Sequence, residues 1–143
     1  MALPSLISIP NGEHIDGTFS KTEMHRRLQD LRTLMVQQDI DTVLLTSYHN
    51  INYYADFLYC AFGRNYGLII DQEKQTSISA NIDGGQPARR TVGDNLVYTD
   101  WQQDNFYKAV SSLVHTRNRV GIEFDHVSIQ VREKLAAALP ECE

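Results

Sequence analysis

The chain has 143 residues, of which 42% are hydrophobic and 22% are charged, a composition typical of one globular domain with a substantial core. Its formal net charge of -5 argues against a nucleic-acid-binding protein, which would need a basic surface. No apolar run approaches the roughly 20 residues of a membrane-spanning helix, and the first residues lack the pattern of a secretory signal. Cys60 and Cys142 are too few for a disulfide framework or a zinc site, so we expect a cytoplasmic protein.

The first predicted helix follows an irregular start. Residues 1–17 carry Pro or Gly at four positions and are expected to form an irregular arm. Ser20 and Glu23 have the spacing of a capping box, in which each side chain accepts a hydrogen bond from a free amide at the helix start. Apolar residues at helical spacing extend the helix to about Gln38 and should form one buried face: Met24, Leu28, Leu31, Leu34 and Met35.

Strands and further helices alternate after this point. Strands are predicted at residues 41–46, 66–70, 75–80, 96–99 and 120–124. Helices are predicted at residues 104–116 and 128–139, with a turn or short helix at 49–55 and a minor helix near residue 90. In the last helix, Ile129, Leu135 and Leu139 should face inward. The polar residues 71–74 suit a hairpin, which imposes antiparallel pairing, whereas the helical connections permit parallel pairing. The sequence therefore predicts an α/β fold with a mixed sheet flanked by helices.

The segment from residue 46 to residue 67 has an unusual composition. It holds five of the seven tyrosines and two of the five phenylalanines, with a single cation, Arg64. A guanidinium has five N–H donors and a permanent charge, so it needs a carboxylate, a phosphate or water. Phe62 and Arg64 are therefore typical of an apolar wall beside an anion-binding group. The spacing also allows Arg64 to form a surface ion pair next to a core phenylalanine.

Other polar residues have both a functional and a structural interpretation. Arg89 and Arg90 could form an anion-binding patch or lie in solvent. His49 and Asn50 could contact a ligand or cap a helix. Cys60, among aromatic residues, is typical of a buried and unreactive thiol.

The chain lacks a recognisable catalytic or metal-binding constellation. The glycine-containing loop at residues 83–85 has neither the Lys nor the Ser/Thr of a phosphate-binding loop. Asp100 and Asp104 flank a predicted helix start, where carboxylates suit the helix dipole. Glu123 and Asp125 follow a strand at its carboxyl end, a better location for function. Because no nucleophile, base and orienting group occur together, we expect no catalytic residue, no metal and no cofactor.

Three long segments carry a family resemblance. They are SYHNINYYADFLYCAFGR (residues 47–64), SISANIDGGQPARRTVG (77–93) and VYTDWQQDN (97–105). They resemble the amino-terminal domain of the bacterial creatinases (creatine amidinohydrolases), and a looser similarity extends over most of the chain. The wider pita-bread family, with prolidase and aminopeptidase P, shares a weaker pattern here.

The resemblance implies both a fold and a role. The fold would be a ribonuclease H-like domain with a mixed sheet of five or six strands. Creatinases are homodimeric cytoplasmic hydrolases that convert creatine and water to sarcosine and urea without a metal. Their amino-terminal domain reaches the active site of the partner subunit, where a phenylalanine and an arginine contact creatine. The matching positions here are Phe62 and Arg64, which would be substrate-binding residues acting in trans.

The resemblance also implies that the catalytic residues lie outside this sequence. In creatinases a histidine and its acidic partners belong to a larger carboxyl-terminal domain, which would follow residue 143. We therefore expect residues 1–143 to be one amino-terminal domain without activity of its own, and an unpaired sheet edge could favour self-association. A related pita-bread hydrolase, such as a proline-specific peptidase, and a stand-alone binding module remain alternatives.

Overall fold

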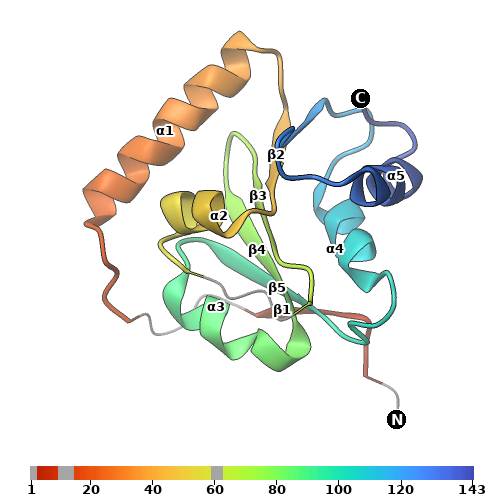
Figure 1. The fold of residues 1–143 in the computed structure, drawn as a ribbon. Helices are drawn as coiled ribbons and strands as arrows, with labels where there is room; N and C mark the ends of the chain where they lie inside the picture. Colours follow the sequence, from red (N-terminus) through yellow and green to blue (C-terminus); the bar gives the residue numbers. More distant parts are fainter. Residues whose placement is uncertain (1–2, 10–14, 59–62) are drawn as a thin grey trace.

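The computed structural model describes residues 3–9, 15–58 and 63–143, which form one mixed sheet with helices on both faces (Figure 1). The strands are β1 (Leu6–Ile9), β2 (Thr42–Leu45), β3 (Gly67–Ile70), β4 (Gln75–Ala80), β5 (Asp94–Tyr98) and β6 (Val120–Ile122). The helices are α1 (Lys21–Gln37), α2 (Tyr48–Ala55), α3 (Gly85–Arg90), α4 (Asn105–Leu113) and α5 (Ile129–Ala138), with a 3-10 turn, η1 (Asn81–Asp83). The predicted α/β class is confirmed.

The sheet combines antiparallel and parallel pairs in the order β1-β5-β4-β3-β2-β6. β3 and β4 form the predicted antiparallel hairpin. Its turn is closed by the Asp71 carboxylate, which accepts hydrogen bonds from the backbone amides of Glu73 and Lys74, each 2.8 Å long. β4 and β5 are parallel, as are β2 and β6. The crossover from β4 to β5 runs through η1 and α3, because parallel strands cannot be joined by a tight turn.

Two hydrophobic clusters lie on opposite faces of the sheet. Successive strand residues point to opposite faces, so Val43 and Leu45 pack with α1 and α2, whereas Leu44 packs with α4 and α5. Figure 1 shows the two helix pairs on either side of the sheet. Since both faces are covered, all four residues of β2 and of β3 are buried, which explains why these strands read as continuous apolar runs.

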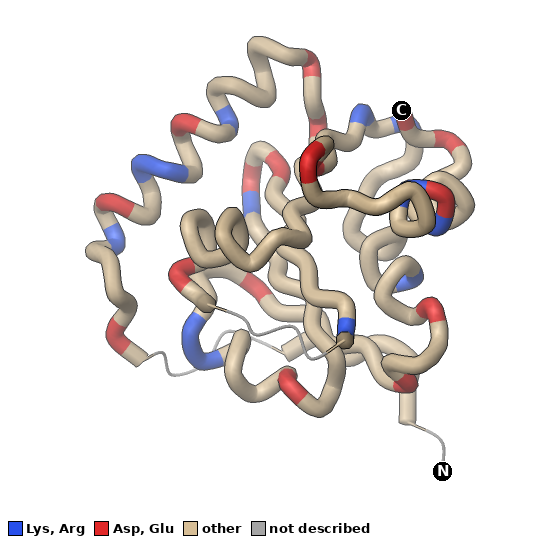
Figure 2. Tube along the Cα trace, in the orientation of Figure 1, with Lys and Arg blue, Asp and Glu red and all other residues tan. Residues whose placement is uncertain are grey.

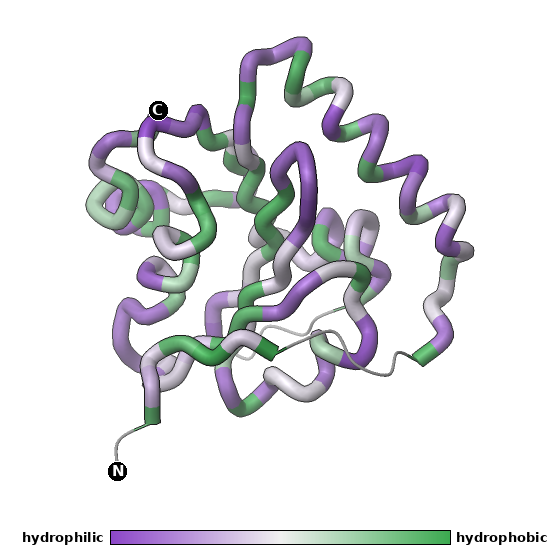
Figure 3. The backbone as a smooth tube through the Cα atoms, turned by 180° about the vertical axis from the view of Figure 1, so that it is seen from behind, coloured by the Kyte–Doolittle hydropathy of each residue, from purple (hydrophilic) through white to green (hydrophobic). Residues whose placement is uncertain are grey.

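The charge and hydropathy of the chain follow this layering. Lys, Arg, Asp and Glu lie mainly on helices and connections, while the central strands carry few of them (Figure 2). Hydrophobic stretches follow the central strands, and α1 alternates between hydrophobic and hydrophilic segments (Figure 3). The sheet therefore supplies the core, and α1 contributes one apolar side to it.

The predicted irregular arm is wrong for part of its length. Residues 6–9 form β1, which pairs antiparallel with β5 at the edge of the sheet. Thr99 extends this pairing, because its amide donates to the Ser5 carbonyl at 3.1 Å and its hydroxyl donates to the Pro4 carbonyl at 2.9 Å. The strand prediction failed because β1 has only four residues between prolines, too short for alternation to stand out.

Two side chains expected in the core lie outside it. Met24, Leu28 and Met35 are buried as predicted, but Leu34 is 51% exposed. In α5, Leu135 is buried and Leu139 packs against the core, whereas Ile129 is 80% exposed at the start of the helix.

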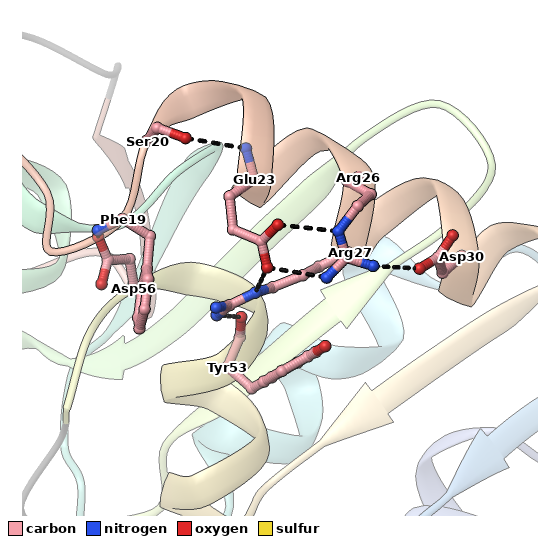
Figure 4. Close-up of polar contacts among 8 residues, drawn as sticks. All are labelled: Phe19, Ser20, Glu23, Arg26, Arg27, Asp30, Tyr53 and Asp56. Atoms are coloured by element: carbon pink, nitrogen blue, oxygen red, sulfur yellow. Dashed lines mark hydrogen bonds and ion pairs between the residues drawn. The ribbon is translucent and has the colours of Figure 1, made fainter.

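The start of α1 is fixed by a buried arginine rather than by a complete capping box (Figure 4). The Ser20 hydroxyl accepts the Glu23 amide at 3.2 Å, as predicted. The Glu23 carboxylate does not return this contact and instead accepts hydrogen bonds from Arg26 and Arg27. These two arginines, Arg26 first, lower the pKa of Glu23 from 4.5 to about 2.

Arg27 joins α1 to α2. Its guanidinium donates to the Tyr53 carbonyl at 2.9 Å and lies 4.0 Å from the Phe19 ring centroid and 4.3 Å from the Tyr53 ring centroid. Arg27 is only 7% exposed, so it packs as a core residue whose charge is compensated by Glu23 and aromatic faces.

Replacing Arg27 by Ala should lower the free energy of unfolding by about 2–3 kcal/mol, because packing, cation–π contacts and a partly buried ion pair are lost together. Arg26→Ala is the matched control: Arg26 also binds Glu23 but is 52% exposed, so its loss should lower the free energy of unfolding much less than the loss of Arg27. Urea denaturation followed by circular dichroism measures both. Equal losses for the two variants would contradict the role of Arg27 as a link between helices.

Candidate functional site

Arg64 lies in the connection that leads from α2 to β3. Its Nε donates to Asp83 Oδ2 at 2.8 Å, and its Nη2 donates to Asp83 Oδ1 at 3.2 Å. The Arg64 side chain is 15% exposed and that of Asp83 is 21% exposed. Of the two interpretations open from the sequence, an ion pair is therefore present, but it is a largely buried, two-point pair rather than a surface contact. Phe62 lies outside the described residues.

The backbone next to Arg64 is held by the core. The Tyr98 hydroxyl donates to the Asn65 carbonyl at 2.7 Å, and Tyr98 itself is 1% exposed in β5. Tyr66, also buried, packs edge to face against Phe57 with ring centroids 6.0 Å apart. Arg64 thus lies between Gly63, whose φ is 75°, and the two residues Asn65 and Tyr66 that contact the core.

Arg64 also lines a small, mainly apolar cavity of about 220 Å³. Its aromatic lining comes from the start of α2, from the segment just before β3 and from α4, and further lining residues lie around the start of α5. The lining comprises Thr46, Tyr48, Ile51, Arg64, Asn65, Tyr66, Phe106, Tyr107, His126, Val127, Ser128 and Val131. A guanidinium at an apolar cavity suits a small ligand that combines a carboxylate with an apolar or planar body.

Glu123, expected at a functional position, is instead a structural anchor. Its carboxylate accepts hydrogen bonds from the Thr46 amide (2.6 Å) and hydroxyl (3.0 Å) and from the Ser47 amide (2.9 Å) and hydroxyl (2.5 Å). The Asn50 side-chain amide adds a fifth bond at 2.6 Å. Burial raises the pKa of Glu123, but the hydrogen bonds from Ser47, Thr46 and Asn50 lower it by more, so the pKa lies below 4.5.

The helix-cap interpretation of His49 and Asn50 is wrong, because Ser47 caps α2. Asn50 instead donates to Glu123, and the His49 ring centroid lies 3.9 Å from that of Tyr48. Arg90 is exposed and donates to the Gln86 side chain at 3.1 Å. Cys60 lies outside the described residues.

The described part of the chain carries neither a cluster of metal-binding side chains nor a membrane-spanning helix. Among the described residues, no group of three or more His, Cys, Asp or Glu side chains could hold a metal ion. None of the helices within the described ranges has the length and apolar character needed to cross a membrane.

Comparison with known proteins decides the family. The profile of the creatinase/prolidase N-terminal domain family matches residues 27–143. The chain belongs to this family. It is 48% identical over 136 residues to the creatinase of Bacillus sp. (strain B-0618), an alignment that covers 92% of this chain and 33% of the creatinase. The creatinase/prolidase domain described here thus spans about a third of the length of that relative.

Solved structures of proline-specific peptidases share the fold of this creatinase/prolidase domain. A proline dipeptidase from Streptococcus pneumoniae TIGR4 superposes with a TM-score of 0.73 at 16% identity, covering 82% of this chain and 87% of that chain. The creatinase/prolidase N-terminal domain of an X-Pro dipeptidase from Streptococcus pyogenes gives a TM-score of 0.72 at 14% identity, covering 82% and 92%. At such identities the similarity concerns the fold alone.

The sequence pattern does not reveal Asp83 as the partner of Arg64. The two residues are 19 positions apart, and the glycine-containing loop that Asp83 begins suggests a phosphate loop rather than an ion pair. The hairpin nevertheless contained the signal. Its register pairs Gly67 with Ile78, so residues just before β3 lie beside residues just after β4. Continued by three residues beyond Gly67 and Ile78, this register places Arg64 opposite Asn81, the first residue of η1.

Glu123→Gln should reduce the free energy of unfolding by about 2–3 kcal/mol at pH 7, because the amide cannot accept the same set of donors. The lowered pKa of Glu123 means that its stabilising contribution is complete above the pKa of the unfolded chain and is lost as pH falls through the folded-state value. The difference between variant and parent should therefore shrink below about pH 4.5. Urea titrations from pH 3 to pH 7 measure this.

Asp125→Asn is the control for this experiment. Asp125 follows the same strand but is exposed, so its neutral replacement should change stability by less than about 0.5 kcal/mol. A Glu123→Gln variant as stable as Asp125→Asn would contradict the anchoring role.

Proposed function

We propose that this chain is the substrate-contacting, dimer-forming amino-terminal domain of a creatinase, whose parent reaction converts creatine and water to sarcosine and urea. The observation that carries the proposal is the 48% identity to the Bacillus sp. creatinase across 92% of this chain. The peptidase structures that share the fold are only 16% and 14% identical, so sequence similarity favours creatinase over a proline-specific peptidase.

In this proposal Phe62 and Arg64 contact creatine bound in the active site of the partner subunit. Arg64 would bind the creatine carboxylate, for which a planar guanidinium is the best-matched side chain. Its pairing with Asp83 and the bond from Tyr98 to Asn65 support a fixed position for this group. Such a group contributes positioning rather than bond breaking.

The bond-breaking chemistry is assigned to the part of the parent enzyme outside this domain. There a histidine would transfer a proton from the attacking water to the leaving nitrogen, and carboxylates would hold the creatine guanidinium. The 143-residue chain alone should therefore release no urea from creatine, which a coupled urea assay would test. Steady urea production by the pure chain would contradict this assignment.

A chimera gives the most direct functional test. In it, this chain replaces the matching third of the Bacillus sp. creatinase, and urea release from creatine is measured. The chimera should be active. Arg64→Ala should raise KM for creatine about 10- to 100-fold with a smaller change in kcat, because a carboxylate contact made before the chemical step is lost.

Arg89→Ala is the matched control, since Arg89 is an exposed arginine in the last turn of α3. It should leave both constants unchanged. A fall in kcat with unchanged KM for Arg64→Ala would contradict the positioning role. A chimera that is stably folded but inactive on creatine would overturn the proposed function.

The peptidase alternative and the stand-alone binding module predict different results. A peptidase domain would support cleavage of X-Pro dipeptides and not of creatine by the parent protein. A stand-alone module would bind creatine tightly without further domains, whereas a half-site that acts in trans should show almost no affinity. Calorimetric titration of creatine into the chain identifies a stand-alone module, and hydrolysis assays of the parent protein with creatine and with X-Pro dipeptides separate the creatinase from the peptidase.

A further inference from the structure

We propose that Asp83 is the positioning residue for Arg64, and that it makes the Arg64 site selective for monoanionic carboxylates over dianions. The proposal rests on the function proposed above, in which Arg64 binds a substrate carboxylate. Asp83 is not one of the two substrate-binding residues, Phe62 and Arg64, that the sequence predicts.

The geometry of the ion pair fixes the plane of the Arg64 guanidinium. Two N–H groups of one guanidinium edge donate to the two oxygens of Asp83, at 2.8 Å and 3.2 Å. A single bond would leave the guanidinium free to rotate about it, whereas two parallel bonds fix its plane. Because both side chains are largely buried, at 15% and 21% exposure, solvent screens the pair less than it would a surface contact.

Asp83 is itself attached closely to the sheet. It ends η1, which follows β4 directly after the buried Ala80. The next residue, Gly84, lies so close to β5 that an added Cβ would be 2.6 Å from Val97 Cγ1. The turn that carries the carboxylate therefore rests on the sheet, and only a residue without a side chain fits at position 84.

Tyr98 connects the two halves of this arrangement. Its backbone pairs with Ala80, immediately before η1, and its hydroxyl holds the Asn65 carbonyl, immediately after Arg64. The backbones on both sides of the ion pair are thus tied to one buried residue of β5. A guanidinium held in this way loses little conformational entropy when it binds a ligand.

The charge of Asp83 affects which anions Arg64 can bind. Asp83 places a negative charge against the positive charge of Arg64, so the pair has no net charge. A monocarboxylate can still accept charge-assisted N–H bonds from such a pair. A dianion such as hydrogen phosphate meets stronger repulsion from Asp83, and this repulsion acts as a specificity element.

The positioning role is tested by NMR on the 143-residue chain, with the Arg64 Nε–H resonance as the probe. In the parent chain this proton should exchange slowly with water. Asp83→Asn should speed its exchange at least about tenfold, because the charge-assisted two-point pair is lost. Asp125→Asn, a neutral replacement of an exposed carboxylate, is the control and should leave the Arg64 exchange rate unchanged. Unchanged exchange in Asp83→Asn with an otherwise intact spectrum would overturn the proposal.

The selectivity is tested by titrating acetate and inorganic phosphate to high concentration into the same samples at constant ionic strength, with the shift of the Arg64 Nε–H resonance reporting the weak binding expected of a half-site. Asp83→Asn should shift the ratio of the two affinities toward phosphate by about tenfold, while Asp83→Glu, which keeps the charge, should retain the preference for acetate. An unchanged ratio in Asp83→Asn would contradict the selectivity.

These measurements use neither creatine nor a catalytic domain, so their outcome is separate from that of the chimera. An inactive chimera together with the expected NMR results would remove the creatinase function but not the role of Asp83. In an active chimera, Asp83→Asn should raise KM for creatine and strengthen inhibition by phosphate with little change in kcat. If Asp83→Asn instead lowers kcat and thermal stability without raising KM or strengthening inhibition by phosphate, Asp83 has only a structural role.

Discussion

The Glu123 carboxylate accepts five hydrogen bonds that fix the connection between β2 and α2. The position of the candidate site depends on this connection. Glu123 follows β6, and its donors lie at the end of β2 and in the first turn of α2, more than 70 residues earlier. One buried charge therefore sets where β2 ends and where α2 begins. The aromatic segment that leads to Arg64 starts from that fixed position.

The Arg64–Asp83 ion pair is a second polar contact, and its role differs from that of Glu123. It links the connection between α2 and β3 to η1, which follows β4, and Tyr98 binds the adjacent Asn65 carbonyl. Glu123 satisfies backbone and side-chain donors that would otherwise be buried without partners. The Arg64–Asp83 pair instead presents a charged planar group at a cavity, an arrangement that stability alone does not require. We therefore propose a functional role for Arg64 and assign a structural role to Glu123.

Much of this could be predicted from the sequence because the signals were local. The Ser20 cap, the α1 periodicity, the β3–β4 hairpin and the buried β2 all follow from spacing within a few residues, and each is present. β1 escaped prediction because its four residues become a strand only through pairing with β5. Glu123 and Asp83 could be noticed but not assigned, since their partners come from distant segments. The fold was thus more predictable than the site.

The central claim is that Arg64 serves the active site of the partner subunit, and mixed dimers of the chimera test it most directly. One chimera carries Arg64→Ala with an intact downstream portion, and the other carries Arg64 with an inactivated downstream portion. If Arg64 acts in trans, mixing them should restore creatine hydrolysis with the parental KM, because one site in each mixed dimer combines an intact downstream portion with an intact Arg64. Activity that keeps only the raised KM of Arg64→Ala after mixing would contradict the account.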